Sequence, residues 1–109
     1  MRLYYGLWFC IDSKQILFMI RNAFVLDNSS IIKFEQTEDN EISVLVITEE
    51  KYNGFSYPKE TRFGKVELCF LLQAELNLVN VFASDIDLEY KNGEITAYVR
   101  LTKMETKEL

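Results

Sequence analysis

The chain has 109 residues and a mass of 12.8 kDa, and 49% of its residues are hydrophobic, so it has the length and the apolar content to fold as one β-rich domain over residues 1–109. Its 12 Lys and Arg against 17 Asp and Glu give a net charge of −5, which argues against direct nucleic-acid binding and favours a basic partner. The chain has no His, the commonest general base and metal ligand, and this composition argues against an enzyme.

The first segment, residues 3–11, is an apolar run that predicts a strand. It is too short for a membrane span of about 20 residues and has no signal-cleavage site, so we expect a cytoplasmic protein without membrane contact. Cys10 lies in this run and Cys69 in a later one, and both are expected to be buried thiols because free Cys is among the most buried residue types.

Residues 13–26 fit two structures. Ile16, Leu17, Ile20, Ala23 and Phe24 have helical spacing behind a weak capping box, Asp12-x-x-Gln15. The stretch from Ile11 to Ile16 also fits strand, turn, strand, and we favour strands here over the helix.

Residues 31–36 and 42–48 flank a polar cluster and predict a hairpin. With Glu38 opposite Glu41, Phe34 would meet Leu45 and Ile32 would meet Ile47. The following residues, 51–64, combine four aromatic residues with two Gly and the single Pro, and we expect a loop there.

From Lys65 to Val79 apolar residues alternate with others, which predicts a long strand with a bend or break near Gln73. A helix over residues 69–79 is the alternative. Near the C-terminus, Asn92-Gly93 predicts a type I′ turn with Lys91 opposite Glu94. That turn would place Leu88 opposite Ala97 on an apolar face and Asp87 opposite Tyr98 on a polar face.

These segments together predict a mainly β fold. We expect an antiparallel meander of about seven or eight strands that forms a curved sheet or small barrel. The alternative is an α+β fold with one helix near residues 13–26.

Acidic residues cluster around the expected turn at residues 37–41 and along residues 85–89, and aromatic residues cluster in residues 51–64. Acidic patches can dock a basic partner, and exposed aromatic side chains are common anchors of interfaces. The expected partner-binding residues are Glu38, Asp39, Glu41, Tyr52, Phe55, Tyr57, Arg62, Asp85, Asp87 and Glu89. No motif for catalysis, phosphate binding or metal binding is present, so no catalytic residue, cofactor or metal is expected.

The sequence therefore favours a small, acidic, non-enzymatic protein that binds and blocks a basic macromolecule, such as an immunity or inhibitor protein against a toxin, a nuclease or a nucleic-acid-handling complex. One alternative is a ligand-binding or enzymatic β-barrel whose pocket is lined by Tyr4, Tyr5 and Trp8. Another is a structural subunit of a homo-oligomer.

Overall fold

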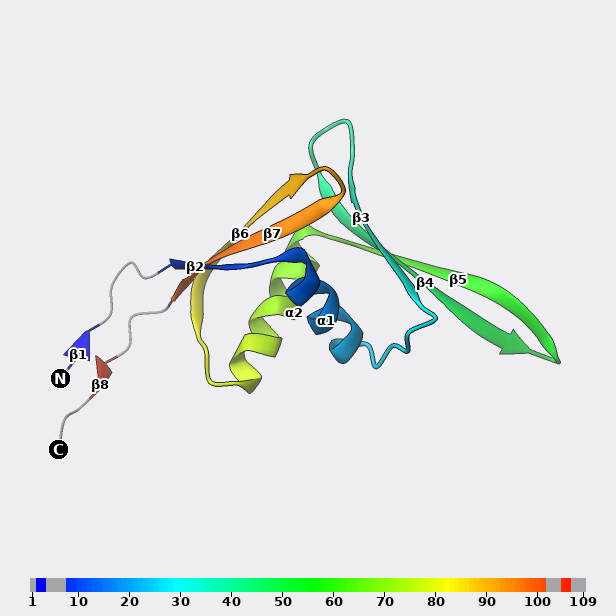
Figure 1. Cartoon of the computed structure of the whole chain (residues 1–109), viewed down its shortest axis with the longest axis horizontal. Helices are drawn as coiled ribbons and strands as arrows, with labels where there is room; N and C mark the ends of the chain where they lie inside the picture. The colour runs from blue at the N-terminus through cyan, green and yellow to red at the C-terminus, as the bar shows by residue number, and fades with distance from the viewer. Residues whose placement is uncertain (1, 4–7, 102–104, 107–109) are drawn as a thin grey trace.

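The structure is a computed structural model, which describes residues 2–3, 8–101 and 105–106 (Figure 1). Two helices and two three-stranded antiparallel sheets, ordered β2-β7-β6 and β3-β4-β5, make up the body, and a two-residue ladder pairs β1 with β8. The elements in chain order are β1 (Arg2–Leu3), β2 (Trp8–Ile11), α1 (Ser13–Ala23), β3 (Ile31–Gln36), β4 (Ile42–Tyr52), β5 (Phe55–Gly64), α2 (Lys65–Leu78), β6 (Ala83–Lys91), β7 (Glu94–Leu101) and β8 (Glu105–Thr106).

The body consists of two copies of one strand–helix–hairpin unit, β2-α1-β3-β4 and β5-α2-β6-β7. Each unit gives its first strand to the other, because β5 completes the sheet of β3 and β4 while β2 completes the sheet of β6 and β7. Equivalent helix positions are 52 residues apart, and the equivalent buried residues are Ile16 and Ile20 in α1 and Leu68 and Leu72 in α2. The two units share a burial pattern and not their residues, which is why no repeat is visible in the sequence.

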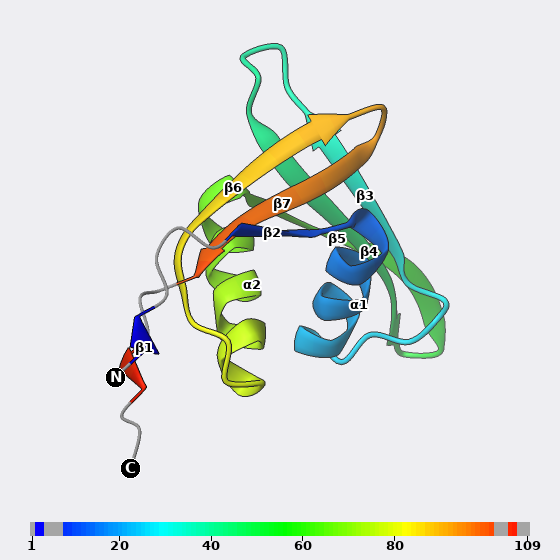
Figure 2. The same ribbon diagram turned by 60° about the vertical axis from the view of Figure 1, so that its left-hand side comes forward.

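The helices lie side by side, and the two sheets cover them from different sides (Figure 2). Side chains from both helices and both sheets form one core. The prediction of a mainly β fold with antiparallel strands is confirmed, but the predicted single meander or barrel of seven or eight strands is wrong. In the described part of the chain there is no closed barrel, six strands form the two sheets instead of seven or eight in one meander, and there are two helices.

Helix α1 replaces the strands that we favoured for residues 13–26, and the alternative prediction of a helix there is confirmed. Its first turn is held by a reciprocal capping box. The Asp12 carboxylate accepts from the Gln15 backbone N–H at 2.9 Å, and the Gln15 side chain accepts from the Asp12 N–H at 3.1 Å. One face, with Ile16 and Ile20, is fully buried.

Helix α2 replaces the long strand predicted for residues 65–79, so the helix that we kept as the alternative is the observed structure, and it begins four residues earlier than expected. The Glu67 carboxylate accepts from the Gly64 N–H at 3.1 Å, which satisfies one free donor at the helix start. Leu68, Leu72 and Leu76 form the buried face. The helix ends at Leu78, after which Asn80 adopts a left-handed conformation.

The hairpin at Asn92-Gly93 is confirmed in its register. Lys91 lies opposite Glu94, Leu88 opposite Ala97 and Asp87 opposite Tyr98. Both turn residues have positive φ, at 52° and 80°, as a type I′ turn requires.

The hairpin at residues 37–41 exists, but its predicted register is wrong by one residue. Phe34 lies opposite Val44 and Ile32 opposite Val46. The turn has three central residues instead of two, because Asn40 adopts a left-handed conformation with φ 60° and the Thr37 N–H donates to the Glu41 carbonyl. Val44 and Val46 therefore face the core, while Leu45 is buried on the other face.

The two cysteines are free, and their predicted burial is only partly observed. Cys10 is exposed on the outer face of β2, opposite Tyr98, so that expectation is wrong. Cys69 is half-buried under β6, where its thiol donates to the Ile86 carbonyl at 3.8 Å. Loss of hydration on burial raises the pKa of the Cys69 thiol above its ordinary value.

Candidate partner-binding arm

The part of the chain expected to be a loop, residues 51–64, is instead the end of β4, a tight turn and strand β5. The ladder of β3 ends where Ile31 pairs with Ile47. Beyond that point residues 48–52 pair only with residues 55–59, and we call this two-stranded ribbon the arm. Its length of five residues per strand corresponds to about 17 Å. Figure 1 shows the arm projecting from the body on the side away from the two chain ends.

The arm turns at Asn53-Gly54, whose φ angles of 50° and 79° form a type I′ turn. The same dipeptide signal predicted the turn at Asn92-Gly93, and applied here it would have predicted the arm. Pro58 obscured the signal, since Pro interrupts central strands. It is tolerated because β5 is an edge strand.

Three aromatic side chains lie on one face of the arm. Tyr52 pairs with Phe55, and Tyr57 lies opposite Glu50, so all three have the parity of the core-facing residues of β4 and β5. Their exposed fractions are 70% for Tyr52, 76% for Phe55 and 48% for Tyr57. The aromatic face thus continues the inner face of the sheet beyond the point where the core ends.

A cleft of about 230 Å³ opens at the base of this face, between the arm and the end of α1. No sequence motif marks this cleft, because it depends on the packing of α1 against the sheet. Phe24 packs against Phe63 with ring centroids 5.7 Å apart. The cleft is lined by Phe24, Leu26, Val46, Thr48, Glu50, Lys59 and Thr61.

Val25 lies next to the cleft and has an unusual conformation. Its φ is 52°, in the left-handed region that a β-branched residue rarely adopts, and it is 90% exposed. Such a conformation costs about 1–3 kcal/mol and is held only where its surroundings impose it. Here the Leu26 N–H donates to the Arg21 carbonyl at 2.8 Å, and the Arg21 guanidinium donates to the carbonyls of Asp27 and Ser30, which fix the turn.

The structure separates the other predicted partner-binding residues from the arm. Arg62 lies on the opposite face of β5, where its guanidinium donates to the Glu35 carboxylate at 2.7 Å. The exposed acids of the β3–β4 turn lie at the far end of β4, about 33 Å from the arm tip for an 11-residue strand. Those acids are Glu38, Asp39 and Glu41.

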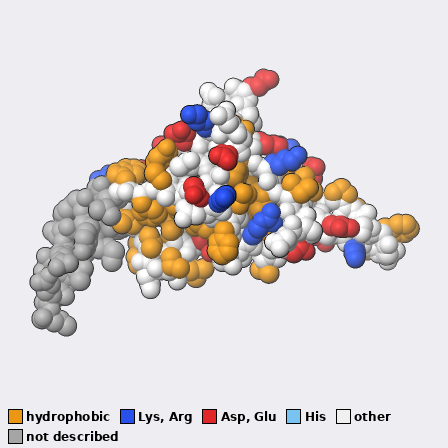
Figure 3. All heavy atoms as spheres, viewed as in Figure 1, with side chains coloured by type: hydrophobic (Ala, Val, Ile, Leu, Met, Phe, Trp, Pro, Cys, Tyr) orange, Lys and Arg blue, Asp and Glu red, His pale blue; other side chains and the backbone are white. Residues whose placement is uncertain are grey.

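Asp85, Asp87 and Glu89 form a second acidic group on the outer face of β6. Asp87 is partly compensated, because the Lys65 ammonium lies 3.5 Å from its carboxylate. Asp85 lies opposite Arg100, whose guanidinium is 5.9 Å from the centre of the Trp8 ring system. Figure 3 shows Lys and Arg side chains among the acidic ones on the face it presents. The acids therefore make a diffuse negative surface and not a continuous patch.

The Tyr98 hydroxyl lies beside this row and donates to the Glu89 carboxylate at 3.3 Å. The negative charge of Glu89 raises the pKa of Tyr98, because it disfavours a second anion nearby. Among the described residues, no three side chains of His, Cys, Asp or Glu gather closely enough to hold a metal ion.

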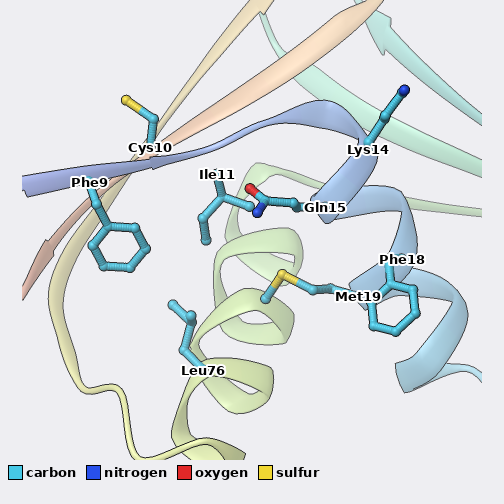
Figure 4. A pocket seen from close by; sticks show the side chains of 8 residues that line it. All are labelled: Phe9, Cys10, Ile11, Lys14, Gln15, Phe18, Met19 and Leu76. Atoms are coloured by element: carbon cyan, nitrogen blue, oxygen red, sulfur yellow. The ribbon is translucent and has the colours of Figure 1, made fainter.

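The larger concavity, about 440 Å³, lies between β2, α1 and α2 (Figure 4). Its lining is apolar, with Phe9, Ile11 and Leu76 around it. The Lys14 ammonium and the Cys10 thiol point away from its centre (Figure 4), and the Gln15 side chain is engaged in capping α1. The polar groups that would orient a small ligand therefore do not converge here. Of the predicted pocket residues, Tyr4 and Tyr5 lie outside the described residues, and Trp8 is exposed on the outer sheet face.

Neither α1 nor α2 combines the length and the apolar composition of a membrane-spanning helix. Comparison of the chain with protein-family models, with curated proteins and with solved structures gives no match. The geometry of the arm and the distribution of charge are therefore the features that bear on function.

Proposed function

We propose that this protein is a non-enzymatic binding protein that uses the arm to occupy a concave surface of a basic partner protein. The observation that carries this proposal is a ribbon with only two strands whose one face holds three exposed aromatic residues. A two-stranded hairpin is marginally stable in water unless its face is packed. Tyr and Phe bury a large area at a small cost in side-chain entropy. Packing of this face against a partner surface would therefore stabilise both the arm and the complex.

The charge of the chain supports a basic partner. The net charge is −5, and the acids of the β3–β4 turn and of β6 lie outside the arm, where they would guide the approach without entering the contact. The cleft at the arm's base offers Phe24 to an apolar side chain of the partner, and its lining holds one acid, Glu50, and one base, Lys59. Occlusion of the partner's working surface is the mode of action, as for an immunity or inhibitor protein against a toxin or nuclease.

Affinity capture from the native cell tests this proposal. The wild-type chain is compared with an arm variant that combines Tyr52→Ser, Phe55→Ser and Tyr57→Ser. Phe18→Ser is the control, because Phe18 is an aromatic residue of α1 that is 71% exposed and lies outside the arm. We expect a basic protein to be recovered with the wild type and the control and lost with the arm variant. Recovery of the same proteins with all three chains would contradict the proposal.

A further inference from the structure

Helix α2 is apolar on its exposed face as well as on its buried face. Val66, Phe70, Ala74 and Leu78 follow one another at intervals of four residues along the side opposite the core, and we call them the α2 stripe. Val66 is 65%, Phe70 66% and Leu78 76% exposed. The solvent side of a surface helix is normally polar, so we expect this apolar stripe to be covered in the functional protein.

The repeat within the fold provides an internal comparison. The α1 positions equivalent to Val66, Phe70 and Ala74 are Lys14, Phe18 and Asn22, so α1 presents an ordinary mixed surface where α2 presents an apolar one. Phe18 and Phe70 are equivalent residues with nearly equal exposure, 71% and 66%. The extended apolar stripe is thus a property of the second unit and not of the fold.

We propose that the α2 stripe is the interface of a homodimer, in which α2 packs antiparallel against α2 of a second copy. A two-fold axis that crosses the stripe midway between Phe70 and Ala74 places each Phe70 against Ala74 of the other copy, so that a large side chain meets a small one. The same axis places Val66 near Leu78 of the other copy. Ridges of residues four apart are the elements that interdigitate in the commonest class of helix packing.

The charge along the α2 stripe also fits a second copy and not a basic partner. Each copy carries a net charge of −5, so a dimer interface must avoid opposed carboxylates. On α2, Glu67 borders the stripe, and the two-fold axis places it opposite Asn77 of the other copy. Asp85 of β6 also lies beside the stripe, where it lines the adjoining groove together with Lys65. Glu75 is turned toward α1, where its carboxylate accepts from the Asn22 amide at 3.3 Å. A basic protein would find few acids here to recognise.

A groove beside the stripe gives the second copy room to pack. It has a volume of about 300 Å³ and lies between the first half of α2 and the open edge strand β6, with Val66, Phe70 and Ile86 in its lining. In the antiparallel arrangement this groove receives Leu78 of the other copy. The stripe consists of four side chains of one helix, so the contact is smaller than the ~800 Å² per partner of a standard interface. We therefore expect a weak dimer with a dissociation constant in the micromolar range.

Sedimentation equilibrium of the full chain, from micromolar to several hundred micromolar protein, tests the dimer. We expect the average mass of the wild type to rise from 12.8 kDa toward twice that value. Phe70→Ser and, separately, Ala74→Glu should abolish this rise, and Phe18→Ser, the equivalent change on α1, should leave it intact. Circular dichroism establishes that each variant retains its helices. Ala74 is exposed, so its replacement leaves the core unchanged.

A wild-type chain that stays at 12.8 kDa over the whole range would overturn the dimer. Loss of the dimer with Phe18→Ser as well as with Phe70→Ser would also overturn it, because the association would then not depend on the stripe. The arm variant should remain dimeric. Failure of the dimer is thereby distinguished from failure of the proposed partner binding, which depends on the arm.

Discussion

Tyr98 and Glu89 lie side by side on the outer face of the β2-β7-β6 sheet, and their contact affects the ionisation of the Tyr98 hydroxyl. The folded chain holds the Tyr98 proton more tightly than the unfolded chain does, because ionised Glu89 raises the pKa of the phenol. A group whose pKa is raised on folding stabilises the fold below its unfolded pKa and loses that contribution as the pH rises. The fold therefore loses this contribution as the pH rises above about 10, the ordinary value for Tyr, and through the raised pKa of Tyr98.

Glu89→Gln is expected to lower the pKa of Tyr98 toward its ordinary value, since the substitution removes the nearest negative charge. Ultraviolet absorbance of tyrosinate against pH measures it, with the Tyr98→Phe chain subtracted to isolate this residue from the five other Tyr. Glu94→Gln is the matched control, because Glu94 lies on the same strand as Tyr98 and does not contribute to the shift. An unchanged pKa in the Glu89→Gln chain would mean that the contact does not persist in solution.

Among the elements, the turn signal at Asn92-Gly93 predicted its hairpin correctly, whereas the alternation of apolar residues over 65–79 did not predict its helix. Asn92-Gly93 fixed a hairpin through backbone conformation alone, and the structure has the predicted pairs. In α2 the apolar residues recur at every second position, so every other one of them lies four positions along the chain. This spacing produces two series that each follow one side of a helix. They are Leu68, Leu72 and Leu76 on one side, and the residues of the α2 stripe on the other. The first series is the core and the second is the α2 stripe, and the two together imitate a strand.

Truncation to Ala should lower the free energy of unfolding much more in the first series than in the second. Leu68 is fully buried, so Leu68→Ala should lower the free energy of unfolding by about 2–5 kcal/mol through lost burial and a cavity. Phe70→Ala should change it by less than about 0.5 kcal/mol in dilute protein, where the α2 stripe faces water. Urea denaturation of the two variants measures the difference. Equal losses would show that α2 is packed on both faces within one chain.

The two type I′ turns give a second matched pair. Gly54 and Gly93 have φ of 79° and 80°, and an added Cβ would contact nothing at either site, so the cost of Ala is conformational in both. This conformational cost of Gly→Ala should be about 1–2 kcal/mol at each turn. Gly93→Ala should lower the urea midpoint because its hairpin carries the buried Leu88 and Ile95. Gly54→Ala should open only the arm tip and leave the midpoint unchanged, and a fall equal to that of Gly93→Ala would show that the arm is part of the cooperative core.

At the scale of the whole molecule, the exchange of first strands between the two units was beyond prediction. Which strand completes which sheet is decided by long-range packing of Ile16, Leu68 and their neighbours, and no local signal encodes it. In the candidate site, too, one part could be predicted from the sequence and another part could not. The aromatic residues of the arm were predicted from composition, while the cleft beside them depends on where the end of α1 packs.

Charge reversal of β6 tests the role of the diffuse acidic surface. The triple variant Asp85→Lys, Asp87→Lys and Glu89→Lys should slow association with the captured partner and reduce its dependence on salt, because long-range attraction acts on the encounter. Stability should change little, since exposed ion pairs such as Lys65–Asp87 contribute ~0–1 kcal/mol. Surface plasmon resonance at two salt concentrations measures the rates. An unchanged association rate at low salt would assign recognition to the arm alone.

Amide hydrogen exchange of the chain, with and without the partner recovered by affinity capture, tests whether the arm is the binding element. In the free protein the amides of residues 48–59 should exchange faster than those of the β6–β7 hairpin, because the ribbon has no third strand and no packed face. On binding, exchange should slow in residues 48–59 and near Phe24 at the cleft. Protection confined to other elements, with residues 48–59 exchanging as fast as before, would contradict it.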